Sequence, residues 1–435
     1  MNKKYFGEFA KYTSLNVLGM LGLSCYILAD TFFIARGLGS NGLAALNLAL
    51  PIYSFIHGIG LMLGMGGATE YSIVKIQSRH NESNRIFTSA VYMAVLFSLS
   101  AVFAGLFLSN DITQLMGADS RVEKMTNTYL KMILLFSPAF IMNNILICFV
   151  RNDGNPNLSM LAMLGGSFSN IILDYVFIFP LGMGIFGAVF ATCLAPIISM
   201  CILAVHISSK RKGFHFIKTS PSISIFSRIT ASGIPSLITE FSSGIVMIVF
   251  NSVMLKLCKN TGVAAYGVIA NISIVAVSVY TGIAQGIQPL LSKAHGSADL
   301  KGIHHTLKYA LTSIAVISAV IYSLIFFNAD TITQIFNSEN SSVLQDIAVN
   351  GLKLYFIAIP FAGFNIIISV FFTSTAKPKP AQVISVLRGI VLIVPMAYIM
   401  SALFGIYGAW LSYPLTEAAV AVIAVISKKL SDSKQ

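Results

Sequence analysis

Five acidic residues lie inside stretches of the sequence that are otherwise apolar, and they carry most of its potential for chemistry. They are Asp30, Glu70, Asp174, Glu240 and Glu417. A carboxylate in such a stretch is costly to bury and therefore usually has a function. None of the five has a lysine or arginine next to it in its own apolar stretch. Unpaired carboxylates that face one interior would bind a cation or a proton, because a bare buried carboxylate is poorly solvated.

Asp174 is the most informative of these acids because Asn170 precedes it by four residues. This spacing puts both side chains on one face of a helix. Amide and carboxylate oxygens suit an alkali cation or a proton relay better than a transition metal. The hydroxyl group of Thr192, in the following apolar stretch, could join them. The alternative is a structural hydrogen-bonded pair between helices.

The other four acids differ in their surroundings. Asp30 is the one charged residue of its apolar stretch, with Thr31 beside it, and its alternative role is that of a snorkelling acid or one paired with Arg36. Glu240 follows Pro235 by five residues, and its alternative role is that of an acid favoured near a helix N-terminus. Glu70 and Glu417 are predicted to be interfacial acids near the ends of their stretches.

The elements that position these acids are apolar segments long enough to cross a membrane. The chain is 56% hydrophobic and 10% charged, against about 25% charged residues in a typical soluble domain. Runs of about 20 apolar residues predict membrane-spanning helices. Twelve such runs are present, at 14–35, 44–74, 87–108, 127–149, 158–180, 183–207, 230–254, 262–290, 306–328, 349–373, 380–402 and 405–427. The sequence therefore predicts an all-α integral membrane protein with twelve transmembrane helices.

The two halves of the chain repeat each other at a distance of about 220 residues. Ile112–Leu115 returns as Ile332–Ile335, and Gly184–Ala188 returns as Gly405–Ala409. Pro138 and Pro360 occupy matching places. Duplicated halves of six helices each are typical of secondary transporters, with the pathway between the halves.

A polar segment divides the repeats. We expect an N-terminal six-helix bundle at 1–207, a cytoplasmic linker at 208–228 and a C-terminal six-helix bundle at 229–435. Because both halves start on the same side, they would be related by an axis along the membrane normal. The predicted fold is two pseudo-symmetric bundles that face each other across a central cavity.

The net charge of +12 sets the topology of the chain. Most of its 28 lysines and arginines fall in the loops that share a side with the N-terminus. The positive-inside rule then puts both termini in the cytoplasm of a multi-pass plasma (inner) membrane protein. This distribution argues against nucleic-acid binding. The five cysteines form no CxxC pair, and the sequence contains no P-loop, HExxH, GxSxG or Rossmann motif. We expect no enzyme activity and no cofactor.

Several motifs occur together in an order and spacing that resemble the multidrug and toxic compound extrusion (MATE) family. Asp30-Thr31 is followed by Gly42–Ala45, and Arg151–Pro156 follows the fourth apolar run. Asn170-x-x-x-Asp174 is then followed by Gly184–Ala188 and Thr192. The resemblance covers essentially the whole chain.

The resemblance implies a cation-coupled antiporter that exports amphipathic, often cationic compounds in exchange for sodium or protons. In several members of the family, an aspartate of the first span, an asparagine and an aspartate of the fifth and a threonine of the sixth bind the coupling cation in the N-terminal bundle. These roles carry over to Asp30, Asn170, Asp174 and Thr192, with Asn144 as a further neighbour. The pattern suits either Na⁺ or H⁺ as the coupling ion and requires no other metal.

The chain departs from the family pattern in two places. Residues 349–373 contain no acid, so the cation site that some members have in the C-terminal bundle is not expected, and Glu240 would be a lone acid there. The first span also lacks the proline that bends in some members and has only Gly19 and Gly22.

The substrate cavity should combine an acid with adaptable apolar groups. Its predicted lining residues are Glu240, Phe140, Tyr175, Met247 and Tyr280. A cavity within one chain is compatible with a monomer in the lipid bilayer. A flippase for lipid-linked substrates on the same type of fold is the first alternative, although such a protein would need a more basic cavity. A membrane-embedded enzyme and a channel are further alternatives.

Overall fold

The computed structural model describes residues 3–209, 212–337 and 341–433, and its regular elements are all helical. Eight of its helices are long and apolar enough to cross a membrane, or nine if the bent pair of α4 and α5 forms one span. The helices of the first half are α1 (Lys3–Ile76), α2 (His80–Phe107), α3 (Ser109–Leu115), α4 (Glu123–Leu135), α5 (Ser137–Asn152), α6 (Pro156–Ile178) and α7 (Gly184–Ile207). Those of the second half are α8 (Ile223–Gly296), α9 (Leu300–Phe336), α10 (Ser342–Tyr355), the 3₁₀ turn η1 (Phe356–Ala358), α11 (Ile359–Ser374), α12 (Pro378–Val386), the π-helical turn η2 (Leu387–Val391) and α13 (Ile393–Asp432).

Three long helical segments contain a sharp break and therefore supply two crossings each, namely α1, α8 and the continuous segment of α12, η2 and α13. The breaks lie at Gly39 in α1, at Lys259 in α8 and at Gly405 in α13. With α4 and α5 joined at a 50° bend, and with α10 and α11 forming one crossing, the described residues make six crossings in each half. This is the predicted arrangement of twelve transmembrane helices in two six-helix bundles.

The backbone breaks themselves repeat with the period seen in the sequence. Gly39 has φ 68° and ψ −159°, and Lys259, 220 residues later, has φ 54° and ψ −147°. Ser78, just after α1, and Ala298, just after α8, also have positive φ, at 62° and 56°. Left-handed φ is disfavoured for residues other than glycine, so its recurrence at matching places shows that the two halves share one backbone plan.

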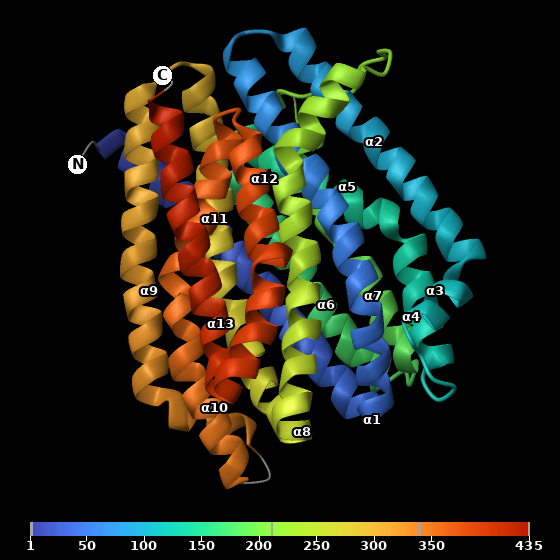
Figure 1. Cartoon of the computed structure of the whole chain (residues 1–435). Helices are drawn as coiled ribbons and strands as arrows, with labels where there is room; N and C mark the ends of the chain where they lie inside the picture. Colours follow the sequence, from blue (N-terminus) through green and yellow to red (C-terminus); the bar gives the residue numbers. More distant parts are fainter. Residues whose placement is uncertain (1–2, 210–211, 338–340, 434–435) are drawn as a thin grey trace.

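The two halves form separate bundles that pack along α1 and α8. Figure 1 shows α2 to α7 on one side and α9 to α13 on the other, with both termini at the same end of the molecule. Each bundle has its own apolar core, and α1 and α8 provide most of the contact between them. We call the end that holds the termini the terminal end.

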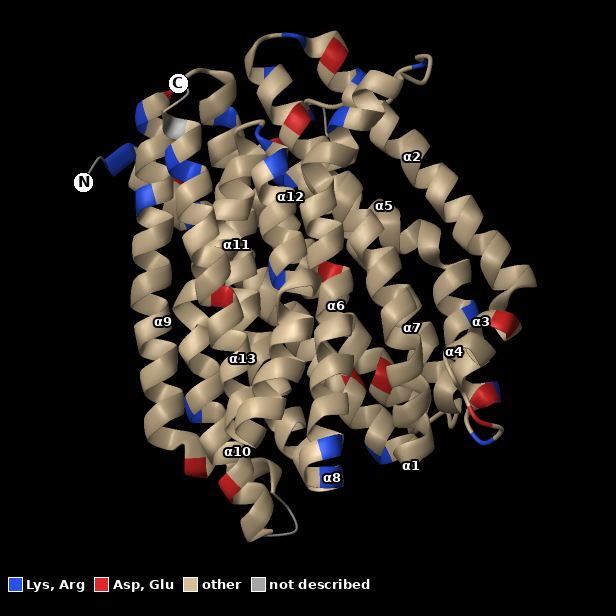
Figure 2. Ribbon diagram, in the orientation of Figure 1, with Lys and Arg blue, Asp and Glu red and all other residues tan. Residues whose placement is uncertain are grey.

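Charged residues are concentrated toward the ends of the helices. In Figure 2 the lysines and arginines gather mainly at the terminal end, and the middle of the molecule is largely uncharged. This distribution is the one that the positive-inside rule describes for a cytoplasmic face.

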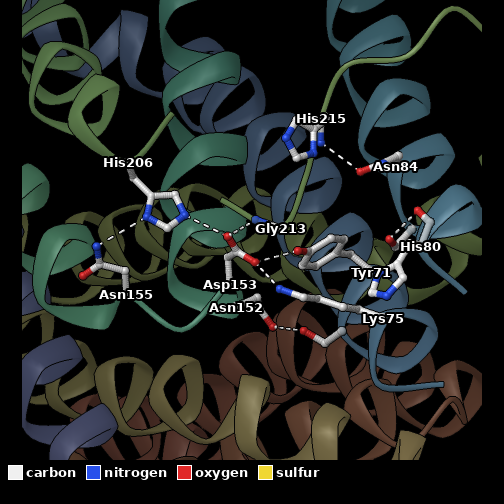
Figure 3. Close-up of polar contacts among 12 residues, drawn as sticks. Tyr71, Lys75, His80, Asn84, Asn152, Asp153, Asn155, His206, Gly213 and His215 are labelled. Atoms are coloured by element: carbon white, nitrogen blue, oxygen red, sulfur yellow. Dashed lines mark hydrogen bonds and ion pairs between the residues drawn. The ribbon is translucent and has the colours of Figure 1, made fainter. Parts of the chain in front are cut away.

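The segment between α7 and α8 is fastened to the first bundle. Phe214 is buried, and the backbone N–H of His215 donates to Asn84 Oδ1 at 2.9 Å. Gly213 N–H donates to Asp153 Oδ2 at 2.7 Å (Figure 3). Helix α8 begins at Ile223, inside the stretch predicted as the linker, and the domain boundaries at 207 and 229 stay predictions.

Asp153 is the centre of this anchoring cluster, in the turn between α5 and α6. Tyr71 Oη donates to its Oδ1 at 2.6 Å, Lys75 forms an ion pair with it, and His206 Nε2 lies 2.8 Å from Oδ2 (Figure 3). Burial raises the pKa of Asp153, but its hydrogen bonds, with that from Lys75 the largest, outweigh this effect and hold the pKa below its usual value.

Candidate functional site

Asp30 and Asp174 lie against each other in the interior of the first bundle. Asp30 is on α1 and Asp174 is on α6, and both side chains are buried. Their carboxyl groups interact directly. Within the described residues neither forms an ion pair, and the Oδ1 atom of each has no hydrogen-bond partner. The two acids therefore leave oxygen atoms free in a buried place.

Helices α6 and α7 bring two polar side chains next to this pair. With its amide nitrogen facing Asp174, Asn170 donates to Asp174 Oδ2 at 3.0 Å and accepts from the backbone N–H of Thr192 at 3.2 Å. The spacing of four residues puts Asn170 and Asp174 on one face of α6, as the sequence indicates. The Thr192 hydroxyl donates to Ala188 O at 3.2 Å.

This group of oxygen atoms can take up a hard cation or a proton. Two interacting carboxylates repel each other when both are ionised, so a shared proton or a bound cation would relieve the repulsion. The amide of Asn170 and the hydroxyl of Thr192 are oxygen-bearing groups of the kind that alkali ions accept. Among the described residues, Asn144 Nδ2 donates to Phe140 O at 3.3 Å and makes no hydrogen bond to Asp30 or Asp174.

Asp30 also lines the larger of two cavities between the bundles. This outer cavity has a volume of about 340 Å³ and is lined from α1, α4, α7 and α8, with Met247 in its wall. Apart from Asp30, its polar groups are amides and hydroxyls, namely Thr31, Asn47, Asn251, Asn271, Thr192, Tyr26, Tyr53, Tyr129 and Tyr266. The lining suits an amphipathic molecule, because most of its surface is apolar while hydroxyl, amide and carboxyl groups are distributed over it.

A smaller, deeper cavity of about 90 Å³ adjoins the outer one. Phe140, Asn144, His57 and Glu240 are in its wall. Tyr26 and Tyr53 line both cavities, and their hydroxyl oxygens are 2.8 Å apart. This tyrosine pair stands between the carboxylate of Asp30 and that of Glu240.

Two residues predicted to line the cavity are placed elsewhere. The side chain of Tyr175 is 54% exposed on α6, where it packs against Phe33 and Phe179. Tyr280 is fully buried in the second bundle, with its hydroxyl oxygen 2.8 Å from Ser318 Oγ. Their spans were identified from the sequence, but the direction in which each side chain points depends on how the helix is rotated in its bundle.

The expectation that Glu417 is an unpaired interfacial acid is wrong. Its carboxylate is buried and pairs with Arg388, with Arg388 Nη2 2.8 Å from Glu417 Oε1, and Asn365 donates to Oε2 at 2.7 Å. Arg388 lies in the π-helical turn η2, on the span before Glu417. The span of Glu417 contains no lysine or arginine beside it, and its basic partner comes from the neighbouring helix.

Glu70 also has a partner, although it lies near the end of a span as predicted. Arg228, at the start of α8, donates to its Oε2 through Nη2 at 2.6 Å, and Ser232 donates to Oε1 at 3.1 Å. Because Glu70 belongs to α1, this ion pair joins the two halves at the terminal end.

Arg151, in the polar run that follows the fourth apolar stretch, is a buried cation. Its side chain is fully buried at the end of α5, and Nη1 donates to Asn16 Oδ1 and Gln285 Oε1, both at 2.8 Å. Asn152 and Gln288 bond to each other through both amides, at 2.8 and 3.1 Å. Gln285 and Gln288 lie on α8, so these contacts close the terminal end between the bundles. The sequence signal for these contacts is the polar run Arg151–Pro156, which directly follows an apolar span.

The duplicated bundles, the cavities between them and the buried acids define the architecture of a secondary transporter. A family model described as MatE matches residues 17–176 and 235–399. The chain therefore belongs to the MATE family of membrane transporters, and it is not an enzyme.

Curated relatives match over nearly the full length of the chain. The multidrug export protein MepA of Staphylococcus saprophyticus is 24% identical over 414 residues, which are 94% of this chain and 90% of the relative. MepA of Staphylococcus aureus (strain MRSA252) is 25% identical over 413 residues with the same shares.

Solved structures share the fold. One is described as an outward-facing conformation of a multidrug resistance MATE family transporter of the MOP superfamily, with a TM-score of 0.92, 22% identity and coverage of 98% of this chain and 96% of that one. Another is a MOP superfamily transporter from Pyrococcus furiosus, with a TM-score of 0.90, 23% identity and coverage of 98% and 95%. At these identities the likeness concerns the fold alone.

Proposed function

We propose that the protein is a cation-coupled antiporter that exports amphipathic, often cationic compounds, with Na⁺ or H⁺ as the coupling ion. The observation that carries this proposal is the buried pair of Asp30 and Asp174, which has no basic partner among the described residues and reaches the wall of the outer cavity. The MepA relatives are multidrug export proteins, which supports small amphipathic compounds as substrates.

The coupling works through alternating access of the two bundles. The present state, with its contacts closed at the terminal end, corresponds to an outward-facing transporter if that end is cytoplasmic, which the distribution of lysine and arginine supports. A cation that binds Asp30 and Asp174 better in one state shifts the equilibrium toward that state. Substrate and ion affinities must then be linked reciprocally.

The substrate occupies the cavities between the bundles. Phe140, Met247 and the tyrosine pair supply apolar contact, and Glu240 supplies a carboxylate for a cationic group. The cavities lie within one chain, which supports a monomer in the plasma membrane with both termini in the cytoplasm.

The alternative of a flippase for lipid-linked substrates is less well supported. A pyrophosphate headgroup needs basic partners, and neither cavity has a lysine or arginine among its described lining residues.

The test is efflux of a fluorescent cationic dye from proteoliposomes, under an imposed Na⁺ gradient and separately under a proton gradient. We expect one gradient to drive dye movement in the wild type and Asp30→Asn to abolish the driven component while the protein still inserts. Driven efflux by Asp30→Asn at the wild-type rate would refute the role of Asp30, and no efflux under either gradient would refute the antiport proposal.

A further inference from the structure

His57 and Glu240 face each other across the boundary between the two bundles. His57 Nδ1 is 3.4 Å from Glu240 Oε2, and the side chains are 16% and 33% exposed. Helices α1 and α8 come close here because Gly58 has no side chain, since a Cβ atom there would lie 3.3 Å from Glu240 Cβ. Both side chains line the deep cavity.

Within the described lining of this cavity, Glu240 is the only carboxylate and His57 is the only side chain that can become a cation near neutral pH. Tyr53 stacks on His57, with 5.9 Å between the ring centroids and 14° between the planes. The other titratable or charged groups that face the cavity are Tyr26, Tyr53 and Cys148 in its lining, Arg151 behind Cys148 and Gln285, and Asp30 beyond the tyrosine pair.

We propose that His57 is the resident counter-cation of Glu240, which a cationic substrate must displace in order to bind this carboxylate. This inference rests on the proposed function and adds a residue that sets selectivity for the charge of the substrate. While His57 is protonated, it holds Glu240. A cationic substrate that binds the carboxylate takes this place, the proton of the partly exposed His57 passes to solvent, and the ring remains stacked on Tyr53.

A bound cation and the proton of His57 compete because Glu240 and His57 are so close to each other. A substrate cation bound to Glu240 lies within a few ångströms of His57, and a second positive charge there is repulsive. Binding of the cation therefore favours neutral His57, and reciprocally protonation of His57 weakens binding of the cation. An uncharged substrate of the same shape does not compete for the carboxylate and should be insensitive to this proton.

Aromatic residues around Glu240 can accommodate either the substrate cation or the ring of His57. Tyr53 also packs edge-on against Phe140 at 5.6 Å, so the cation site beside Glu240 has two aromatic rings in its wall. Aromatic faces attract cations, and they keep neutral His57 in place by stacking. The site thus suits an aromatic or lipophilic cationic group better than a small hydrated cation, with the rest of a larger substrate in the outer cavity of about 340 Å³.

The experiment measures binding of tetraphenylphosphonium, which is permanently charged, to the full chain purified in detergent, at pH 5.5 and pH 8. Histidine changes charge between about pH 5 and 8, so we expect the wild type to bind at least about five-fold more tightly at pH 8. His57→Gln should bind with nearly the same affinity at both pH values. Glu240→Gln should bind weakly at both.

Controls separate this result from general pH effects and from misfolding. His305→Gln is the matched control, because His305 lies on α9, outside both cavities, stacked on Tyr5 at 5.4 Å. It should keep the wild-type pH profile. His57→Asn serves as a second variant if His57→Gln elutes as an aggregate in size-exclusion chromatography.

Two results would overturn the inference. The first is a wild-type pH profile in both folded His57 variants, which would assign the effect to protonation of Glu240 itself. The second is a wild type that binds equally at both pH values. If either result occurs while a gradient still drives dye efflux, the proposed antiport stands and only the role of His57 is refuted. If the expected binding profile occurs without any driven efflux, antiport is refuted and the role of His57 beside Glu240 stands.

Discussion

Arg388 and Glu417 form an ion pair inside the second bundle, with Arg388 Nη2 2.8 Å from Glu417 Oε1 and side chains that are 12% and 2% exposed. The first bundle contains the opposite arrangement, because Asp30 and Asp174 have no basic partner among the described residues. The two halves share a backbone plan but differ in charge. In the second bundle Glu417 is neutralised by Arg388, whereas in the first bundle Asp30 and Asp174 are free to bind a cation or a proton. This difference supports a coupling site in the first bundle.

Replacing only one residue of the Arg388–Glu417 ion pair should strongly destabilise the protein. Glu417→Gln leaves the Arg388 guanidinium in the interior without a charge partner, which costs about 3–5 kcal/mol of unfolding free energy. Replacing both residues, as Arg388→Met with Glu417→Met, should recover much of the loss, because no unpaired charge remains. Thermal unfolding in detergent measures both variants.

The exposed acid Glu8 provides the control for this experiment. Glu8→Gln should unfold like the wild type. An equal loss of stability in the single and double variants would contradict the argument, because it would mean that packing and not charge determines the cost.

The contact between Arg151 and Gln285 should favour closure of the terminal end. Gln285→Leu removes a hydrogen bond between the halves, and Asn16→Leu removes one of equal length within the first half. A hydrogen bond to a charged group contributes about 1.5–3 kcal/mol, so the ratio of open to closed states should rise about ten-fold or more in Gln285→Leu only. Distances between spin labels at Ser78 and Ser297, near the terminal ends of α1 and α8, report this ratio. An equal shift in both variants would contradict a latch between the bundles.

The membrane-spanning pattern could be predicted from the sequence because each span encodes its own length and hydrophobicity. The 220-residue period of the sequence returns in the backbone breaks, and Pro138, predicted inside a span, lies directly after the 50° bend between α4 and α5. Asn170 and Asp174 share one face of α6 as predicted, since a spacing of four residues fixes this within any helix.

The contacts between helices could not be predicted in the same way. The pairs of Arg388 with Glu417 and of Arg151 with Gln285 join residues of different helices. No periodicity in one span shows which neighbour it faces or how it is rotated. The same limit explains why Tyr175 and Tyr280 lie outside the cavities.

Asp153 should anchor the segment between the halves at neutral pH. Its pKa is held below the usual value of about 3.9. The ionised carboxylate therefore contributes stability that is fully present above the usual pKa and is lost as the pH falls through the lowered pKa. Asp153→Asn should weaken the anchor by about 1.5–3 kcal/mol at pH 7, and the difference from the wild type should shrink below about pH 4.

Limited proteolysis of residues 212–222 at several pH values measures this anchor. Asp119→Asn is the control, because Asp119 pairs with Arg121 on an exposed loop, where such pairs contribute little. A loss of protection in Asp153→Asn that is the same at pH 3.5 and pH 7 would contradict an origin in the carboxylate charge.

Gly154 and Ala376 occupy matching turns of the two halves, and exchanging their residue types should have opposite effects on stability. Both have left-handed backbones, with φ 96° and 55°. This conformation costs a residue other than glycine about 1–2 kcal/mol, and the place of a Cβ atom on Gly154 is open within 4 Å. Gly154→Ala should therefore lower the thermal midpoint through backbone strain alone, whereas Ala376→Gly should leave it unchanged or raise it, because relief of strain offsets the greater entropy of the unfolded chain. Thermal unfolding of the two variants in detergent measures the pair, and a drop of equal size in both would show that the side chain of Ala376 has packing contacts that outweigh its strain.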